Sequence, residues 1–255
     1  MDGAPFNNFP GLRLNTLQTE GSGSAAKLER QIFIDFHTHY ASCAPLPVPP
    51  EVWRVISTPL SDINQLMPPG TIQTLELHPW SGAAWSPEFE QAASLERFSG
   101  IGEVGLDRLR GKRPLDEQLK ILAQACNLAE KLQKTLTIHC VKCFSELLAL
   151  YKELRWQVPT IIHYFRGNLP LAQQLWEHTH FTLSLPPAAL SQQQLMEFLR
   201  NHPEYIRRIV LETDDPQHGD IQKHYQQCAG KWSIPLTELQ QIMSKQLEKL
   251  YYVNK

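Results

Sequence analysis

Long apolar segments, a strong net charge and a regular cysteine pattern are all missing from the 255-residue sequence. A membrane-spanning helix needs about 20 consecutive apolar residues, and proline or charged residues interrupt every apolar run here. We therefore expect no membrane association. The formal net charge of −2 and the pI near 6.6 exclude a strongly basic nucleic-acid-binding protein, although a local basic patch can still bind a phosphate backbone.

The cysteines are few and irregularly spaced. Five are present, an odd number, and no secretory leader is recognisable, so we expect reduced thiols in a cytoplasmic protein. Cys140 and Cys143 form a C-x-x-C motif. A structural zinc site usually needs a second such pair, and the sequence has none, so we do not expect zinc there. No feature of the sequence indicates a protein partner.

The composition divides the chain into a tail and one domain. Glycine, serine, asparagine and proline prevail in residues 1–27, and the Gly-Ser-Gly-Ser segment at 21–24 is typical of a flexible joint. The remaining residues are enough for a single α/β barrel. We therefore predict a flexible N-terminal tail, 1–27, followed by one barrel domain, 28–255.

Beyond the tail, short apolar runs alternate with longer amphipathic segments. This alternation is typical of repeated βα units and a parallel sheet. In the segment 115–132, for example, Leu119, Leu122, Cys126 and Ala129 recur at helical spacing. Strands are predicted at 32–36, 52–57, 71–77, 100–104, 135–139, 160–163, 181–185 and 209–211. Helices are predicted at 87–98, 115–132, 144–154, 169–177, 191–201 and 236–251.

The fold class predicted from this pattern is α/β, a TIM-like (β/α) barrel. Its first βα units are expected to be irregular, because prolines crowd residues 45–50, where the first crossover helix should lie. Proline cannot continue a helix interior. The first crossover is therefore predicted as a loop.

Polar residues that can bind metals stand at or near the ends of five predicted strands. His37 and His39 are two residues apart on the first strand, so both side chains project to the same face. The carboxyl ends of the strands of a parallel barrel converge. Imidazole and carboxylate ligands suit zinc, manganese and similar divalent ions. The sequence therefore predicts a metal site built from His37, His39, Glu103, His139, His163 and Asp214.

Each of these residues also has a structural interpretation. A single histidine at a strand end is more often a hydrogen-bonded structural residue than a ligand. Glu103 could cap a helix or form a salt bridge, and Asp214 or Asp215 could cap the following segment. Metal-competent residues at five strand ends together favour ligation.

Other polar residues are candidates for substrate contacts. His78 ends a predicted strand and either contacts substrate or makes a structural hydrogen bond. Arg166 and Lys142 follow predicted strands and could pair with a phosphate. Glu212 is placed to hold a ligand from behind. The remaining histidines are predicted to be surface or core residues: His178, His180, His202, His218 and His224.

Five motifs follow one another along the chain: Asp35-Phe36-His37-Thr38-His39, Gly102-Glu103-Val104-Gly105-Leu106-Asp107, Ile138-His139, Ile162-His163-Tyr164-Phe165-Arg166-Gly167 and Glu212-Thr213-Asp214-Asp215-Pro216. In this order they resemble the motifs of the TatD family of metal-dependent hydrolases, within the amidohydrolase superfamily. The resemblance implies a barrel fold and one or two divalent metal ions (Zn, Mg or Mn). It also implies deoxyribonuclease activity, with nucleic acid as the substrate.

The resemblance further implies roles for the six candidate ligands. It distributes them over two metals: His37, His39, Glu103 and Asp214 around one, and the bridging Glu103 with His139 and His163 around the other. A metal-bound water would then attack phosphorus, and Asp214 is placed to accept its proton. Glu103 and Asp214 are thus the implied catalytic residues.

The sequence departs from the family pattern at the substrate rim. Val141 stands where the family commonly has an arginine, with Lys142 beside it, and the segment 244–246 lacks an asparagine that the family often has in its last helix. Two alternatives to a nuclease therefore stay open. One is an amidohydrolase that opens an amide, lactone or phosphotriester. A carboxylated lysine on the fourth strand would favour this alternative, but Glu103 stands there instead. The other is a scaffold protein that retains metals but has lost turnover.

Overall fold

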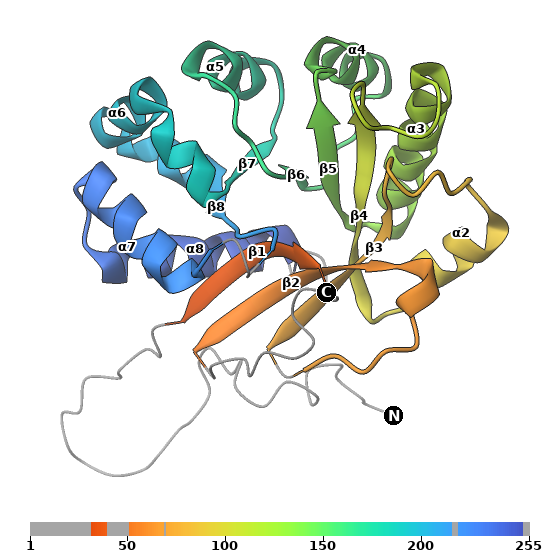
Figure 1. Ribbon diagram of the computed structural model, residues 1–255, viewed down its shortest axis with the longest axis horizontal. Helices are drawn as coiled ribbons and strands as arrows, with labels where there is room; N and C mark the ends of the chain where they lie inside the picture. The colour runs from red at the N-terminus through yellow and green to blue at the C-terminus, as the bar shows by residue number, and fades with distance from the viewer. Residues whose placement is uncertain (1–31, 40–50, 69, 216–218, 252–255) are drawn as a thin grey trace.

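The computed structural model describes residues 32–39, 51–68, 70–215 and 219–251, and these residues form a parallel α/β barrel (Figure 1). The eight strands make one sheet in chain order, and every neighbouring pair is parallel. The predicted TIM-like barrel is confirmed. Its strands are β1 (Phe33–His39), β2 (Val52–Pro59), β3 (Thr71–Leu77), β4 (Phe98–Asp107), β5 (Thr135–Val141), β6 (Thr160–Ile162), β7 (Thr182–Leu185) and β8 (Ile209–Leu211).

The sheet closes where β1 meets the segment that follows β8. An isolated parallel bridge joins Thr38 to Asp214, and the Asp214 N–H donates to the carbonyl oxygen of His37 at 3.0 Å. The buried carboxylate of Asp35 accepts hydrogen bonds from the backbone N–H and the hydroxyl of Thr213 at 2.9 and 2.5 Å. This closure brings His37 and Asp214, which lie near opposite ends of the described chain, side by side.

Helices lie along the outside of the sheet (Figure 1). Three of them begin at side-chain caps that are visible in the sequence, namely Ser86, Asn168 and Asp220. The Ser86 side chain accepts a hydrogen bond from the N–H of Phe89 before α2, and Asp220 accepts from the N–H of Gln222 before α7. The helices are α2 (Pro87–Ala93), α3 (Leu115–Leu132), α4 (Phe144–Leu154), α5 (Leu169–His178), α6 (Gln193–Asn201), α7 (Ile221–Trp232) and α8 (Leu236–Tyr251). Short 3-10 helices are η2 (Leu60–Asp62), η3 (Pro187–Ser191) and η4 (Pro203–Arg208).

Helix α7 is missing from the sequence-based prediction. Its buried residues Ile221, Tyr225, Cys228 and Trp232 recur at helical spacing. The stripe is hard to recognise in the sequence, because tyrosine and cysteine stand where most helices place leucine or alanine, and the buried stripe also includes a histidine, His224. Hydrogen bonds satisfy these polar atoms inside the fold, as when the Tyr225 hydroxyl donates to the carbonyl of Ile34 at 2.9 Å.

Two predicted boundaries are wrong around β4. The strand runs from Phe98 to Asp107, beyond the predicted range 100–104, so Glu103 lies inside the strand rather than near its end. Helix α2 ends at Ala93, before the predicted end at 98. The buried Phe98 already belongs to β4, and its burial against the core ends the preceding helical segment early.

The irregularity expected in the first βα units is present. Between β2 and β3 the described residues form the 3-10 helix η2 rather than an α-helix. The predicted loop crossover at 41–50, the predicted tail at 1–27 and His218 lie outside the described residues. Within the described ranges, no helix has the length and apolarity required to cross a membrane. The four described cysteines, Cys126, Cys140, Cys143 and Cys228, are free.

Candidate metal centre

The carboxylate of Glu103 lies at the middle of the candidate site. Glu103 is buried in β4, with 1 % of its side chain exposed. Its Oε1 atom lies 3.0 Å from Nε2 of His78 and 3.2 Å from Nε2 of His163, and it also contacts Nδ1 of His139. Strands β3, β5 and β6 thus each deliver an imidazole to the same carboxylate oxygen.

The second oxygen of Glu103 faces the histidines of β1. Its Oε2 atom lies 3.2 Å from Nε2 of His37 and 3.4 Å from Nε2 of His39. The Oδ1 atom of Asp214 lies 3.8 Å and 3.4 Å from the same two nitrogens. Glu103 therefore stands between two groups of donor atoms, one on each of its oxygens.

Three overlapping sets of donor atoms are close enough to share an ion. Within each set, all the atoms that could bind the ion lie within 4.8 Å of one another. All six residues predicted to be metal ligands belong to these sets, and His78 joins them. The sets are His37 with Glu103 and His163, His37 with His39 and Asp214, and His78 with Glu103 and His139.

Three of the histidines have a further carboxylate behind them. A histidine that donates one ring N–H to a carboxylate keeps its other nitrogen for a metal. The nitrogens left for the centre are therefore Nε2 of His39, Nε2 of His163 and Nδ1 of His139. The outer contacts are His39 Nδ1 to Glu76 Oε2 at 3.3 Å, His163 Nδ1 to Glu212 Oε1 at 3.3 Å, and His139 Nε2 to Asp107 Oδ2 at 3.0 Å.

Two of these outer carboxylates, Glu76 and Asp107, are missing from the sequence-based set of site residues. Both had a signal in the sequence. Glu76 precedes His78 by two residues, so the two side chains start from the same face of β3. Asp107 ends the motif that begins at Gly102. The position behind a ligand that we predicted for Glu212 matches its contact with His163.

Hydrogen bonds hold the outer carboxylates in place. The Ser57 hydroxyl donates to Glu76 Oε2 at 2.7 Å and accepts from the backbone N–H of Glu103 at 2.9 Å. Glu212 accepts from the backbone N–H of Tyr164 at 2.7 Å and contacts the hydroxyl of Ser184. Because these partners come from separate strands or from the residues that follow them, the barrel itself fixes the orientation of the histidines and carboxylates around Glu103.

Burial and mutual contacts shift the pKa values in the site. Burial alone would raise the pKa of Glu103, but His163 and the other histidines outweigh it and hold this pKa well below its usual value. Burial would also raise the pKa of Asp214, but the hydrogen bond from His39 and the charges of His163 and His37 together outweigh it and lower this pKa. Burial opposes protonation of His39, but Asp214 and Glu103 raise its pKa to about 12. Burial lowers the pKa of His37, and His163 adds to that effect.

Unpaired polar atoms show that the site fits a cation. Within the described residues, neither ring nitrogen of His37 nor Oε2 of Glu103 makes a hydrogen bond of good geometry. All three atoms are buried, and His37 Nε2 lies only 3.2 Å from Glu103 Oε2. A buried polar atom without a partner is costly. Imidazole nitrogen and carboxylate oxygen together suit a divalent ion such as zinc or manganese. A cation between His37 and Glu103 would satisfy these atoms.

His78 lies against Glu103 rather than out at the rim. Its Nδ1 atom accepts a hydrogen bond from the backbone N–H of Trp80 at 2.9 Å. The ring therefore carries its proton on Nε2 and donates it to Glu103 Oε1 at 3.0 Å. This geometry matches the structural hydrogen bond that was one of the two interpretations of His78.

The two other predicted substrate contacts lie apart from the ligands. Arg166 is exposed, and its guanidinium carbon lies 5.9 Å from the ring centroid of Tyr164. Lys142 is exposed, and its carbonyl oxygen accepts from Arg108 at 3.3 Å. Within the described residues, no hydrogen bond or ion pair joins either basic side chain to the six ligands. Their contact with substrate stays a prediction.

Comparison with known proteins identifies the family of the chain. A family model described as TatD related DNase matches residues 61–252. A human protein named 3'-5' RNA nuclease TATDN2 is 32 % identical over 136 residues, which are 49 % of this chain and 17 % of the human protein. The chain thus spans less than a fifth of the length of that curated relative.

Solved structures share the fold at low sequence identity. A TatD family hydrolase from Entamoeba histolytica has a TM-score of 0.71 at 17 % identity, with 87 % of this chain and 98 % of that chain covered. The TatD homologue YJJV from Escherichia coli has a TM-score of 0.70 at 16 % identity, with 88 % and 99 % covered. Because the family model spans most of the barrel, which these structures share, the chain belongs to the TatD-related DNase family.

Proposed function

We propose that the protein is a metal-dependent nuclease that hydrolyses phosphodiester bonds in DNA. One observation carries the proposal: both oxygens of the buried Glu103 carboxylate face imidazoles from separate strands, with the Asp214 carboxylate beside them. The proposed ligands are His37, His39, Glu103, His139, His163 and Asp214. Membership of the TatD-related DNase family supports the reaction class.

The inner residues hold and orient the centre. A divalent ion bound there would lower the pKa of a water molecule and neutralise charge that develops on the phosphate oxygens. Glu103 is anionic and fully enclosed, so it supplies a fixed negative charge between the two groups of donors. His78 donates to that carboxylate and limits its rotation.

Asp214 is the residue best suited to move a proton. Its pKa is held low, so it is anionic near neutral pH, and 34 % of its side chain is exposed, in contrast to Glu103. An anionic carboxylate at the open side of the site can accept the proton that an attacking water loses. We therefore assign Asp214 as the general base.

The proposal also specifies the sugar of the substrate, deoxyribose rather than ribose. The name of the family model favours DNA, whereas the human relative that matches half of this chain is named an RNA nuclease. The enzyme should therefore be tested on DNA and RNA strands of the same sequence, together with bis-p-nitrophenyl phosphate. Faster cleavage of DNA supports the proposal, and cleavage confined to RNA would correct it.

The first prediction concerns Asp214→Asn. We expect kcat for DNA to fall about 100-fold or more, since general-base catalysis contributes roughly that much. Metal content, measured on the same preparations by mass spectrometry, should be largely retained because the other ligands remain. The assays should be run at saturating metal, so that a weakened centre does not imitate a lost base.

Asp220→Asn is the matched control for this variant. It makes the same chemical change, and asparagine also caps helices well, so the N-terminus of α7 keeps its cap. Its activity should equal that of the wild type. The assignment of Asp214 fails if Asp214→Asn cleaves at the wild-type rate. A metal-loaded wild type that cleaves none of the three substrates would instead favour a binding or scaffolding role.

A further inference from the structure

The loop between β4 and α3 carries three arginines that differ in their partners. The Arg108 guanidinium forms an ion pair with Glu146. Arg113 forms an ion pair with Glu117 at 2.8 Å. Arg110 is exposed, and no carboxylate within the described residues pairs with it. It is therefore the arginine of this loop whose charge stays available.

The guanidinium of Arg110 lies over an aromatic ring. Its guanidinium carbon is 3.6 Å from the ring centroid of Trp80, a close cation–π contact. An arginine stacked in this way keeps its N–H groups free at the edge of the guanidinium plane. The contact therefore orders the side chain without using up its hydrogen-bond donors.

The indole of Trp80 is anchored to the candidate metal centre. Its Nε1 donates to Asp107 Oδ2 at 2.6 Å, and the same oxygen lies 3.0 Å from Nε2 of His139. The indole ring centroid is 5.6 Å from that of His139 and 4.8 Å from that of His78. Trp80 thus borders the residues around Glu103, and Arg110 forms the next layer outward.

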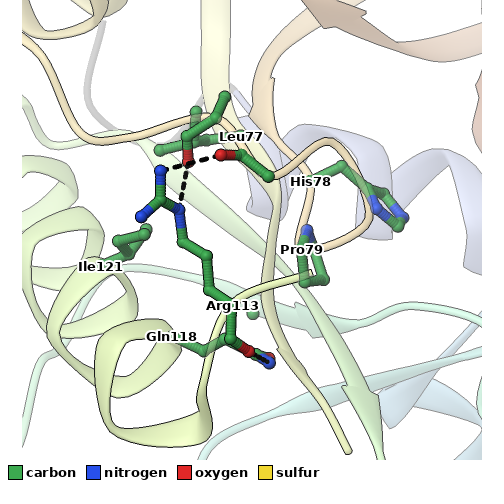
Figure 2. A pocket seen from close by; sticks show the side chains of 9 residues that line it. Leu77, His78, Pro79, Arg113, Gln118 and Ile121 are labelled. Atoms are coloured by element: carbon green, nitrogen blue, oxygen red, sulfur yellow. Dashed lines mark hydrogen bonds between the residues drawn. The ribbon is translucent and has the colours of Figure 1, made fainter. Parts of the chain in front are cut away.

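The two loops that carry Trp80 and Arg110 are tied together from behind. Figure 2 shows the Arg113 guanidinium at a pocket under the β3 loop, with the His78 ring directed away from it. Arg113 donates to the carbonyl oxygens of Gly82 at 2.8 Å and Ala83 at 3.1 Å. The Arg110 N–H donates to Asp107 Oδ1 at 2.8 Å. The arrangement of Arg110 over Trp80 is therefore built into the fold and needs no rearrangement to form.

We propose that Arg110 binds a phosphate that flanks the phosphodiester being cleaved. Trp80 lies between Arg110 and the residues around Glu103. Arg110 is therefore placed to bind a phosphate next to the reacting one rather than the reacting phosphate itself. The guanidinium edge matches phosphate oxygens geometrically. This inference rests on the proposed function, and it narrows the substrate class to strands with more than one phosphate.

The test compares substrates with one phosphate and with several. For Arg110→Ala, we expect KM for a single-stranded oligothymidylate to rise about tenfold, as for loss of a charge-assisted contact, with kcat little changed. The kinetics on bis-p-nitrophenyl phosphate, which has no flanking phosphate, should stay the same. Arg110→Lys should recover part of the loss, because it keeps the charge but not the planar fork.

Arg108→Ala is the matched control, because it removes an arginine of the same loop whose charge Glu146 already neutralises. Its KM for the oligothymidylate should match the wild type. An equal rise for Arg108→Ala and Arg110→Ala would overturn the proposal, since general surface charge would explain both. Equal losses by Arg110→Ala on both substrates would also overturn it, because Arg110 would then act at the reacting group or on the fold.

A binding measurement under conditions without cleavage tests the role of Arg110 separately from the proposed nuclease activity. The affinity of a fluorescent oligothymidylate can be measured by anisotropy in EDTA at several salt concentrations. Loss of one phosphate contact should reduce the slope of log K against log salt by about 0.7 for a single strand. An unchanged slope in Arg110→Ala would refute the contact. If the wild type binds the strand but never cleaves it, the proposed function fails while this measurement still decides the role of Arg110.

Discussion

At the scale of single residues, the candidate metal centre depends on three carboxylates that lie behind its histidines: Glu76, Asp107 and Glu212. Each outer carboxylate selects the tautomer of one histidine and thereby the nitrogen it offers. Glu76 does this for His39 and is itself held by the Ser57 hydroxyl at 2.7 Å. Residues of this kind bind no metal in the proposed centre, yet the geometry of the centre depends on them.

Glu76→Gln should weaken metal binding. Glutamine is nearly the same size, but its amide is neutral and can turn its N–H₂ group toward the N–H of His39. Loss of such an outer partner typically lowers metal affinity about 10- to 100-fold. Competition with a fluorescent chelator measures the change, with the exposed Glu177→Gln on α5 as control. An affinity equal to that of the control would mean that Glu76 does not orient His39.

His224 makes a separate contribution to the pH dependence of stability. Burial lowers its pKa from 6.5 to about 4, although its ring donates to the carbonyl of Leu185 at 2.8 Å. The unfolded chain therefore binds this proton more readily than the folded chain. The stabilisation is present in full above about pH 6.5 and is lost as the pH falls toward 4.

Replacing His224 should therefore flatten the acid side of the stability profile. Between pH 7 and pH 5, His224 should account for about 2 kcal/mol of lost unfolding free energy. His224→Gln keeps a donor for the Leu185 carbonyl but cannot titrate. Urea unfolding in EDTA at the two pH values gives the difference, and the exposed His178→Gln should behave like the wild type. Identical pH dependence in all three proteins would contradict the burial argument.

At the scale of elements, β4 approaches β5 unusually closely at the site. A Cβ on Gly105 would collide with the carbonyl oxygen of His139, and φ at Gly105 is +156°. A Cβ on Gly102 would likewise collide with the carbonyl of Thr137. These glycines let the strand that carries Glu103 pack against the strand that carries His139, so the two side chains can meet.

Gly105→Ala should separate the two strands and destabilise the barrel by about 3 kcal/mol, because backbone atoms have to move. Gly230→Ala on α7 is its control, since nothing lies within 4 Å of the added Cβ. That variant should be stabilised by about 0.5–1 kcal/mol, because alanine restricts the unfolded chain. Thermal or urea unfolding measures both. A Gly105→Ala protein as stable as the wild type would show that the close approach is dispensable.

The sequence predicted most elements but not their limits. Helix α3 is found at its predicted bounds, because its buried residues apart from Gln118 are apolar and recur at helical spacing. Helix α7 escapes prediction, since its buried His224, Tyr225 and Cys228 gain hydrogen bonds or apolar surroundings only in the folded protein. The length of β4 depends on pairing with β5 as far as Val141, which no local pattern reveals.

At the scale of the whole molecule, the position of the inner residues follows from the parallel barrel. Side chains near the carboxyl ends of the strands must converge, so the meeting of His37, His139 and His163 with Glu103 could be expected from spacing alone. The contacts of the histidines with the carboxylates behind them could not be expected from that spacing. Asp107 meets His139 through the register of β4 on β5, which shifts between Ile101 and Val104. Glu76 reaches His39 across β2.

The closure of the sheet has a consequence for synthesis on the ribosome. His37 is among the first described residues to be translated, whereas Asp214 and the bridge to Thr38 appear only after β8. A nascent polypeptide that stops before that point lacks both the last donor and the seam that holds β1. The proposed centre is therefore complete only after the last strand has left the exit tunnel, so fragments from interrupted translation lack an assembled catalytic site.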